Sequence, residues 1–335
     1  MQLTVIRCAH KRKYQVLSNM ISRRILRIKI LQLLYAYFQS ADSSMNKYEK
    51  ELFFSIQKTY DLYHYLLLLI VNIADYAGSR IEIARQKRIP TREDLNPNTK
   101  FIDNLIIGQI RSNRKLNQYL SHTRLSWVNS PELIKRMHNR IRMAPFFKEY
   151  MEDADRNYEQ DKKLITEVYV NEIVSSEYLY QTLEEQSIFW NDEVEFVISM
   201  IAKTLKGFQE KDGENAPLME LFKNEDDREF ARDLFRKVIL HKEEFGKLVE
   251  SYTENWDVER IAFLDLLILE MAITEAVAFP SIPTRVTINE YLEIAKFYST
   301  EKSSVFINGL LDKIFKHLKD EKKIVKTGRG LIGED

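Results

Sequence analysis

Basic residues crowd the first 41 positions of this 335-residue chain. There are eight of them and no acidic residue before Asp42, although the whole chain balances 50 basic against 50 acidic residues. Arg23, Arg24 and Arg27 lie three and four positions apart, a spacing that places cationic side chains on one edge of a helix. Such guanidinium groups can pair with the phosphates of a polyanion, and a solvated helix end or leader is the alternative interpretation.

Catalytic and metal chemistry is not indicated by the remaining reactive residues. No Gly-rich phosphate loop, dinucleotide fingerprint or RNA methyltransferase domain is recognisable. The single cysteine, Cys8, cannot form an internal disulfide or a multi-cysteine metal site, and it favours a reducing cytoplasm. We therefore predict a non-enzymatic cytoplasmic protein without metal or cofactor. The histidines are scattered without metal-ligand spacing, at His10, His64, His122, His138, His241 and His317.

The composition predicts an all-α fold. Only 9 Gly and 7 Pro punctuate the chain, and hydrophobic residues make up 44%, enough for a sizeable core. The most apolar run, at 66–71, is far shorter than the roughly 20 residues that span a bilayer, so no membrane partner is expected.

Apolar residues at helical spacing mark the elements that must position the arginines. A first helix opens at Ser22, a candidate N-cap, and carries Ile25, Ile28, Leu31 and Tyr35 on one face. Short connections between the later patterns imply antiparallel packed helices. Those patterns cover 46–88, 101–120, 131–143, 161–186, 190–208, 226–252, 257–278, 288–298 and 303–318.

The charge pattern suggests several parts. Residues 1–19 are expected to be a disordered leader or the product of a mis-assigned start, with Met20 as the alternative start. Residues 46–185 read as a helical insertion, basic between positions 80 and 148 and acidic from 149 to 229. A solvated surface and a second RNA-binding patch both explain this basic half. Residues 319–335 are expected to form a charged flexible tail.

The last third carries a specific resemblance. Ile-Pro-Thr-Arg-Val-Thr-Ile-Asn-Glu occupies 282–290, and Ser-Val-Phe-Ile-Asn-Gly-Leu-Leu-Asp occupies 304–312. These stretches, with the arginine-rich first helix at 23–35, resemble the NusB family of bacterial transcription antitermination factors. Thr287 and Glu290 fit a capping box that would start a helix after Pro283, and Gly309 suggests close helix approach.

The resemblance implies a NusB-like helical bundle at 20–45 and 186–318, with the insertion added to it. It further implies binding of boxA-like single-stranded leader RNA together with the small-subunit ribosomal protein NusE. The complex would act on the RNA polymerase elongation complex and support transcription of rRNA operons. The alternative is a helical protein-interaction scaffold that has lost RNA binding.

The resemblance also implies site residues. Arg23, Arg24, Arg27 and Lys29 match the basic first helix, and Phe306 lies in a region that faces RNA in the family; the alternative for Phe306 is a core aromatic. Tyr35 and Glu259 match the surface that faces NusE, with core packing and simple solvation as their alternatives. Ile25 stands where the family has a third consecutive arginine.

Overall fold

The computed structural model describes residues 20–41, 44–253 and 262–333. The expectations for residues 1–19 and for Glu259 therefore lie outside the described residues. Within these ranges every regular element is a helix, which confirms the all-α fold class. The chain forms two compact units: unit 1 contains Lys58–Glu220, and unit 2 contains Ile21–Gln57 and Leu221–Asp335.

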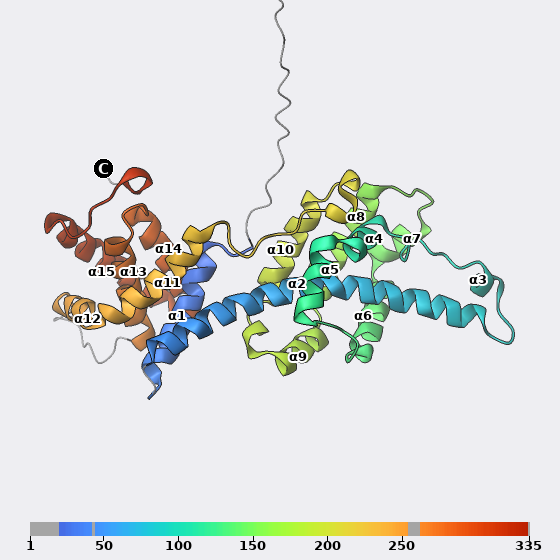
Figure 1. Ribbon diagram of the computed structural model, residues 1–335, viewed down its shortest axis with the longest axis horizontal. Helices are drawn as coiled ribbons and strands as arrows, with labels where there is room; N and C mark the ends of the chain where they lie inside the picture. The colour runs from blue at the N-terminus through green and yellow to red at the C-terminus, as the bar shows by residue number, and fades with distance from the viewer. Residues whose placement is uncertain (1–19, 42–43, 254–261, 334–335) are drawn as a thin grey trace, which may run out of the picture. The chain divides into compact units, whose positions relative to one another are not determined.

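Unit 2 is a bundle built around one apolar helix, α13 (Phe263–Ala278). Leu267, Ile268 and Met271 of this helix are fully buried. A helix that is apolar around its whole circumference needs neighbours on every side, and α1, α11, α12, α14 and α15 all pack against α13 (Figure 1). Those neighbours are α1 (Arg23–Gln39), α11 (Glu225–Leu240), α12 (Lys242–Ser251), α14 (Thr284–Tyr298) and α15 (Glu301–Asp320).

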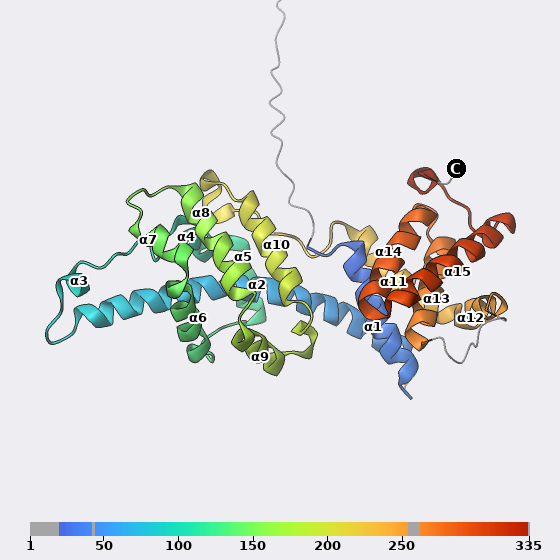
Figure 2. The ribbon, with the colours of Figure 1, turned by 180° about the vertical axis from the view of Figure 1, so that it is seen from behind.

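Unit 1 forms around α2 (Met45–Arg85), whose first turns belong to unit 2. Tyr63, Leu66 and Ile70 of α2 are fully buried. The indole of Trp127 donates to the Tyr65 carbonyl at 2.9 Å. The other elements (Figure 2) are α3 (Arg92–Leu95), α4 (Leu105–Ser112), α5 (Arg114–Thr123), α6 (Pro131–Met143), α7 (Pro145–Glu152), α8 (Tyr158–Glu167), a π-helical turn (Val168–Ile173), α9 (Glu177–Gln186), α10 (Val194–Gly207) and two 3-10 turns (Ile188–Trp190 and Glu210–Asn215).

The boundaries between the two units differ from the boundaries expected for the insertion. The division expected after positions 45 and 185 stays a prediction, whereas the units change after Gln57 and Glu220. The physical reason is α2, which runs unbroken past position 45 and supplies core residues to both units.

Two long predicted helices are broken by side-chain caps. The pattern at 101–120 is divided at Asn113, whose side chain accepts from the Leu116 N–H and starts α5. The pattern at 161–186 is divided before Ser176, whose hydroxyl accepts from the Leu179 N–H and starts α9. Apolar periodicity continues across both caps, so it did not reveal the breaks.

The expected flexible tail makes several contacts with the bundle, although most of its described residues are exposed. Helix α15 continues to Asp320, and Ile324 is 6% exposed. Lys326 Nζ donates to the carbonyls of Ala276 and Phe279 at 2.7 and 3.2 Å, where α13 ends. A lysine therefore satisfies carbonyls that the end of α13 leaves without helical partners.

Candidate nucleic-acid interface

Helix α1 positions the arginine cluster because one face of it is apolar. Leu26, Ile30 and Leu34 are fully buried against the bundle. Ser22 is the N-cap residue, as predicted, but its side chain makes no capping hydrogen bond. The first turn of α1 contains no acidic residue, so the arginines obtain their partners from other helices.

Arg23 is partly exposed and faces α11. Its Nε lies 2.9 Å from Asp227 Oδ1, and its guanidinium stands 4.8 Å from the centre of the Phe230 ring. The Arg23 side chain is 36% exposed. An ion pair at this exposure contributes only about 0–1 kcal/mol, so Asp227 holds Arg23 weakly.

Arg24 is the most exposed arginine of the cluster, at 49% of its side chain. Its Nε and Nη2 donate to the two carboxylate oxygens of Glu290 on α14 at 2.8 and 2.7 Å. The hydrogen bond from Arg24 holds the pKa of Glu290 below its usual range, although partial burial opposes this shift. Glu290 is therefore ionised at neutral pH and ties α14 to α1.

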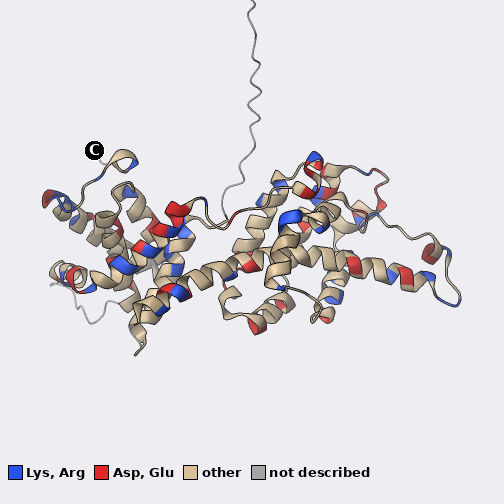
Figure 3. Ribbon diagram, in the orientation of Figure 1, with Lys and Arg blue, Asp and Glu red and all other residues tan. Residues whose placement is uncertain are grey.

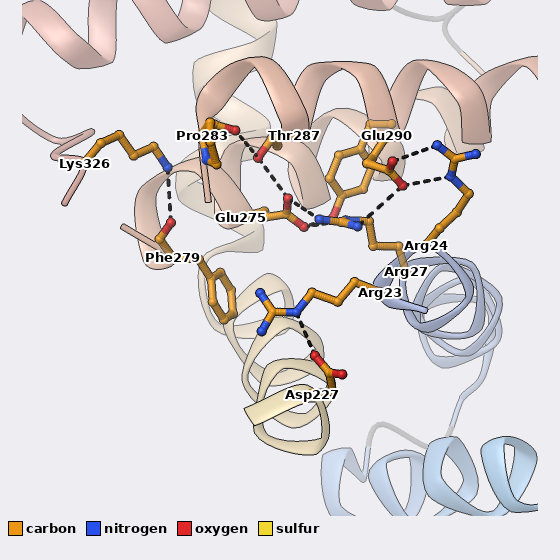
Figure 4. Close-up of polar contacts among 11 residues, drawn as sticks. Arg23, Arg24, Arg27, Asp227, Glu275, Phe279, Pro283, Thr287, Glu290 and Lys326 are labelled. Atoms are coloured by element: carbon orange, nitrogen blue, oxygen red, sulfur yellow. Dashed lines mark hydrogen bonds and ion pairs between the residues drawn. The ribbon is translucent and has the colours of Figure 1, made fainter. Parts of the chain in front are cut away.

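Arg27 is buried, with 3% of its side chain exposed. Figure 4 shows its guanidinium group directed at Glu275. Its Nε and Nη2 donate to the two carboxylate oxygens of Glu275 at 2.7 and 2.8 Å. Thr287 and Tyr291 also donate hydroxyl hydrogen bonds to Glu275, at 2.8 and 3.2 Å. Burial opposes the charge on Arg27, but Glu275 outweighs it and raises the pKa of Arg27. Four hydrogen bonds on one buried carboxylate make this a structural cluster.

The predicted capping box at Thr287 and Glu290 is wrong. Helix α14 begins at Thr284, with Pro283 as the N-cap residue, so Thr287 already lies inside the helix. Its hydroxyl donates to Glu275, and the Glu290 side chain accepts from Arg24. Tertiary contacts thus use both side chains that the local motif would have used at a helix end.

Comparison with known proteins adds an independent observation. The NusB family model matches residues 195–316. The transcription antitermination protein NusB of Salinibacter ruber is 38% identical over 141 residues, which are 40% of this chain and 88% of that protein. The protein of the same name from Geobacter sulfurreducens is 44% identical over 115 residues, covering 32% of this chain and 83% of that protein. The chain belongs to the NusB family. No solved structure matches it.

The further residues expected from the NusB resemblance lie in different surroundings. Lys29 is 3% exposed, and Phe306 is half-buried near the start of α15. Tyr35 is 44% exposed, with its ring centre 5.7 Å from that of Phe263. The structure thus brings Arg23, Arg24 and Arg27 together at the start of α1, and it places Tyr35 three turns along the same helix.

Sequence reasoning missed the three acidic partners of this cluster, which are Asp227, Glu275 and Glu290. It had assigned Glu290 to a capping box. A signal for Glu275 existed, because a carboxylate inside an otherwise apolar helix must find a cation or hydrogen-bond donors when that helix is buried. Nothing in the sequence indicated which of the many arginines would be its partner.

The described residues contain neither a candidate metal site nor a helix suited to cross a membrane. No group of three or more His, Cys, Asp or Glu side chains there could hold a metal ion. None of the helices described here is both long and apolar enough to cross a membrane.

Proposed function

We propose that this protein is a transcription antitermination factor that binds boxA-like leader RNA together with the ribosomal protein NusE. In this proposal the pair acts on the elongating RNA polymerase in the cytoplasm, supports transcription of rRNA operons and performs no catalysis. The supporting observation is the coverage of two relatives named transcription antitermination proteins, of which this chain spans 88% and 83%.

The start of α1 is the RNA-binding site in this proposal, and its arginines have different roles. Arg23 and Arg24 are 36% and 49% exposed, so a phosphate can replace Asp227 or Glu290 as their partner without unfolding the helix. Arg27 and Lys29 are each 3% exposed, which favours a positioning role for both. The half-buried Phe306 is proposed to place its ring against a base.

The NusE-binding surface is proposed to include Tyr35 and Glu259. The ring of Tyr35 is large, rigid and partly exposed, as is common for residues that dominate protein interfaces. The role of Glu259 rests on the resemblance alone, since this residue lies outside the described ranges.

One observation favours the alternative of a scaffold without RNA binding. All three arginines of α1 already have carboxylate partners in unit 2. RNA must displace Asp227 and Glu290 to reach Arg23 and Arg24, whereas a scaffold requires no such exchange.

The deciding experiment measures binding of fluorescent boxA RNA to the full chain, with and without NusE, across a salt series. The test variant is Arg23→Gln with Arg24→Gln. The matched control is Lys313→Gln with Lys316→Gln, which removes two exposed cations from α15 of the same unit. Circular dichroism verifies that both variants fold.

If the proposal is right, this protein and NusE together bind the RNA more tightly than either protein alone. The arginine variant is also expected to lower the slope of log affinity against log salt by about 1.4, because each phosphate contact contributes about 0.7 for single strands. Equal salt slopes in the variant and the control would contradict the proposal that the start of α1 binds RNA. NusE association without any RNA binding would support the scaffold.

A further inference from the structure

A basic groove in unit 1 lies outside the part matched by the NusB family model. Tyr76 and Arg80 are one helical turn apart on α2, and Lys135, His138 and Arg142 follow one another at three and four residues on α6. The rings of Tyr76 and His138 lie 5.2 Å apart, so these two faces meet. We call the surface formed by these five residues and the exposed Val128 the α2–α6 groove.

One end of the α2–α6 groove forms a pocket. A pocket of about 370 Å³ is lined by Tyr76, Val128 and Lys135, among others. Val128 is 77% exposed at its rim. An aromatic side and an exposed aliphatic side give the pocket the apolar character that suits a flat base.

Arg80 and Arg142 are the cations at the other end of the groove. In the part of the chain that the structure describes, neither Arg80 nor Arg142 has a carboxylate within ion-pair distance, and both are exposed. Both are close enough to His138 for their charges to lower its pKa. Between positions 80 and 148 the chain has 15 basic and 5 acidic residues. Glu132, the acidic residue at the pocket, is already paired with Lys135 and Arg136. Figure 3 marks the basic residues of α2 and α6.

His138 is the residue through which α6 contacts α2 in the groove. It is 7% exposed, and its buried Nδ1 has no hydrogen-bond partner among the described residues. Burial, together with the charge of Arg142, lowers the pKa of His138 to about 4, so its ring is neutral at physiological pH. The neutral ring of His138 therefore packs against Tyr76 without adding a positive charge to the groove.

We propose that the α2–α6 groove binds single-stranded RNA, with phosphates at Arg80 and Arg142 and a base against Tyr76 and Val128. This activity goes beyond the function proposed above, because every residue that carries it lies in unit 1. Charge alone would also suit an acidic protein segment. The aromatic and aliphatic pocket beside the cations favours RNA, because carboxylate side chains offer nothing to stack on a ring.

The test uses the full chain with Arg23→Gln and Arg24→Gln in every sample, so that the α1 site does not contribute. The probe is a fluorescein-labelled 20-nucleotide RNA without a boxA-like element, titrated across a KCl series. The groove variant adds Arg80→Gln and Arg142→Gln. The matched control adds Lys163→Gln and Lys211→Gln, two exposed cations elsewhere in unit 1.

The groove variant is expected to bind RNA about tenfold more weakly at 0.1 M KCl, with a salt slope lower by about 1.4, while the control behaves like the parent. RNA containing 4-thiouridine should crosslink to residues 72–80 or 128–142. Equal slopes for groove variant and control, or crosslinks confined to unit 2, would overturn the proposal. So would displacement of the RNA by polyglutamate at equal charge concentration. Failure of boxA binding with NusE leaves this result unaffected, because the α1 arginines are absent from these samples.

Discussion

Arg27 on α1 and Glu275 on α13 form a bidentate ion pair in the core of unit 2, although they are 248 positions apart in the sequence. The pair fixes the start of the arginine-rich helix to the central helix of the bundle. It thereby separates the three arginines by role, because Arg27 is enclosed whereas Arg23 and Arg24 remain partly exposed.

Replacing Arg27 is expected to damage stability more than replacing Arg24. Arg27→Ala leaves Glu275 charged and buried, which costs about 3–5 kcal/mol in the free energy of unfolding. Arg24→Ala breaks a pair in which Arg24 is 49% exposed, and it should cost about 1 kcal/mol. Urea denaturation followed by circular dichroism measures both. A loss of at most about 1 kcal/mol for Arg27→Ala would show that Arg27 is not structural.

The stability of unit 1 should depend on pH through His64. This ring is stacked on Tyr119 at 3.8 Å, and burial lowers the pKa of His64 to about 4. An unfolded histidine titrates near 6.5, so between pH 6.5 and 4 the unfolded state binds a proton that the folded state does not. The free energy of unfolding of unit 1 therefore falls by up to about 3 kcal/mol as the pH falls through this range. The decrease is complete below pH 4.

His64→Phe should reduce this pH dependence. The fluorescence of Trp127, whose ring stacks on Tyr65 at 3.7 Å, reports unfolding of unit 1 in urea at pH 4.5, 5.5 and 7. The exposed His122, changed to Gln, is the matched control. A pH dependence that is the same in the His64 variant and the parent would disprove the role of His64.

Replacement by alanine should lower stability at Gly330 and raise it at Gly309. A Cβ at Gly330 would lie 1.9 Å from the Pro280 carbonyl oxygen, so Gly330→Ala should detach the segment packed against the end of α13. The Thr327 N–H, which donates to that oxygen, should then exchange its hydrogen at least about tenfold faster.

Gly309 is the matching control. The expectation of close helix approach there is wrong, because nothing lies within 4 Å of a Cβ at this position. Gly309→Ala in α15 should raise the free energy of unfolding by about 0.5–1 kcal/mol. A lower free energy of unfolding in this variant would contradict the open space beside Gly309.

Tyr35→Ala should weaken NusE association with little effect on folding. The Tyr35 ring is 44% exposed, so its loss removes contact area without opening a core cavity. If Tyr35 is an aromatic anchor of this interface, its truncation costs about 1.4 kcal/mol or more, which is at least about tenfold in affinity. Leu240→Ala, at a position 69% exposed on α11, is the control in the same titration calorimetry. Unchanged affinity for NusE in the Tyr35 variant would show that Tyr35 is not part of the NusE-binding surface.

The sequence alone determined the helical class, most helix positions and the family. Apolar periodicity reports which face of a segment is buried, and motifs such as Phe-Ile-Asn-Gly at 306–309 are local strings that need no knowledge of distant neighbours. The arginine cluster of α1 was visible for the same reason, since residues three and four apart must meet on a helix.

Tertiary structure alone decided what those residues contact. Thr287 and Glu290 have the spacing of a capping box, yet Glu275 and Arg24 bind their side chains. Arg24 and Arg27 belong to the same short motif, and only the position of α13 and α14 makes one exposed and the other buried. The physical reason is that burial and ion pairing depend on which distant helix packs nearby, and local spacing carries no record of that neighbour.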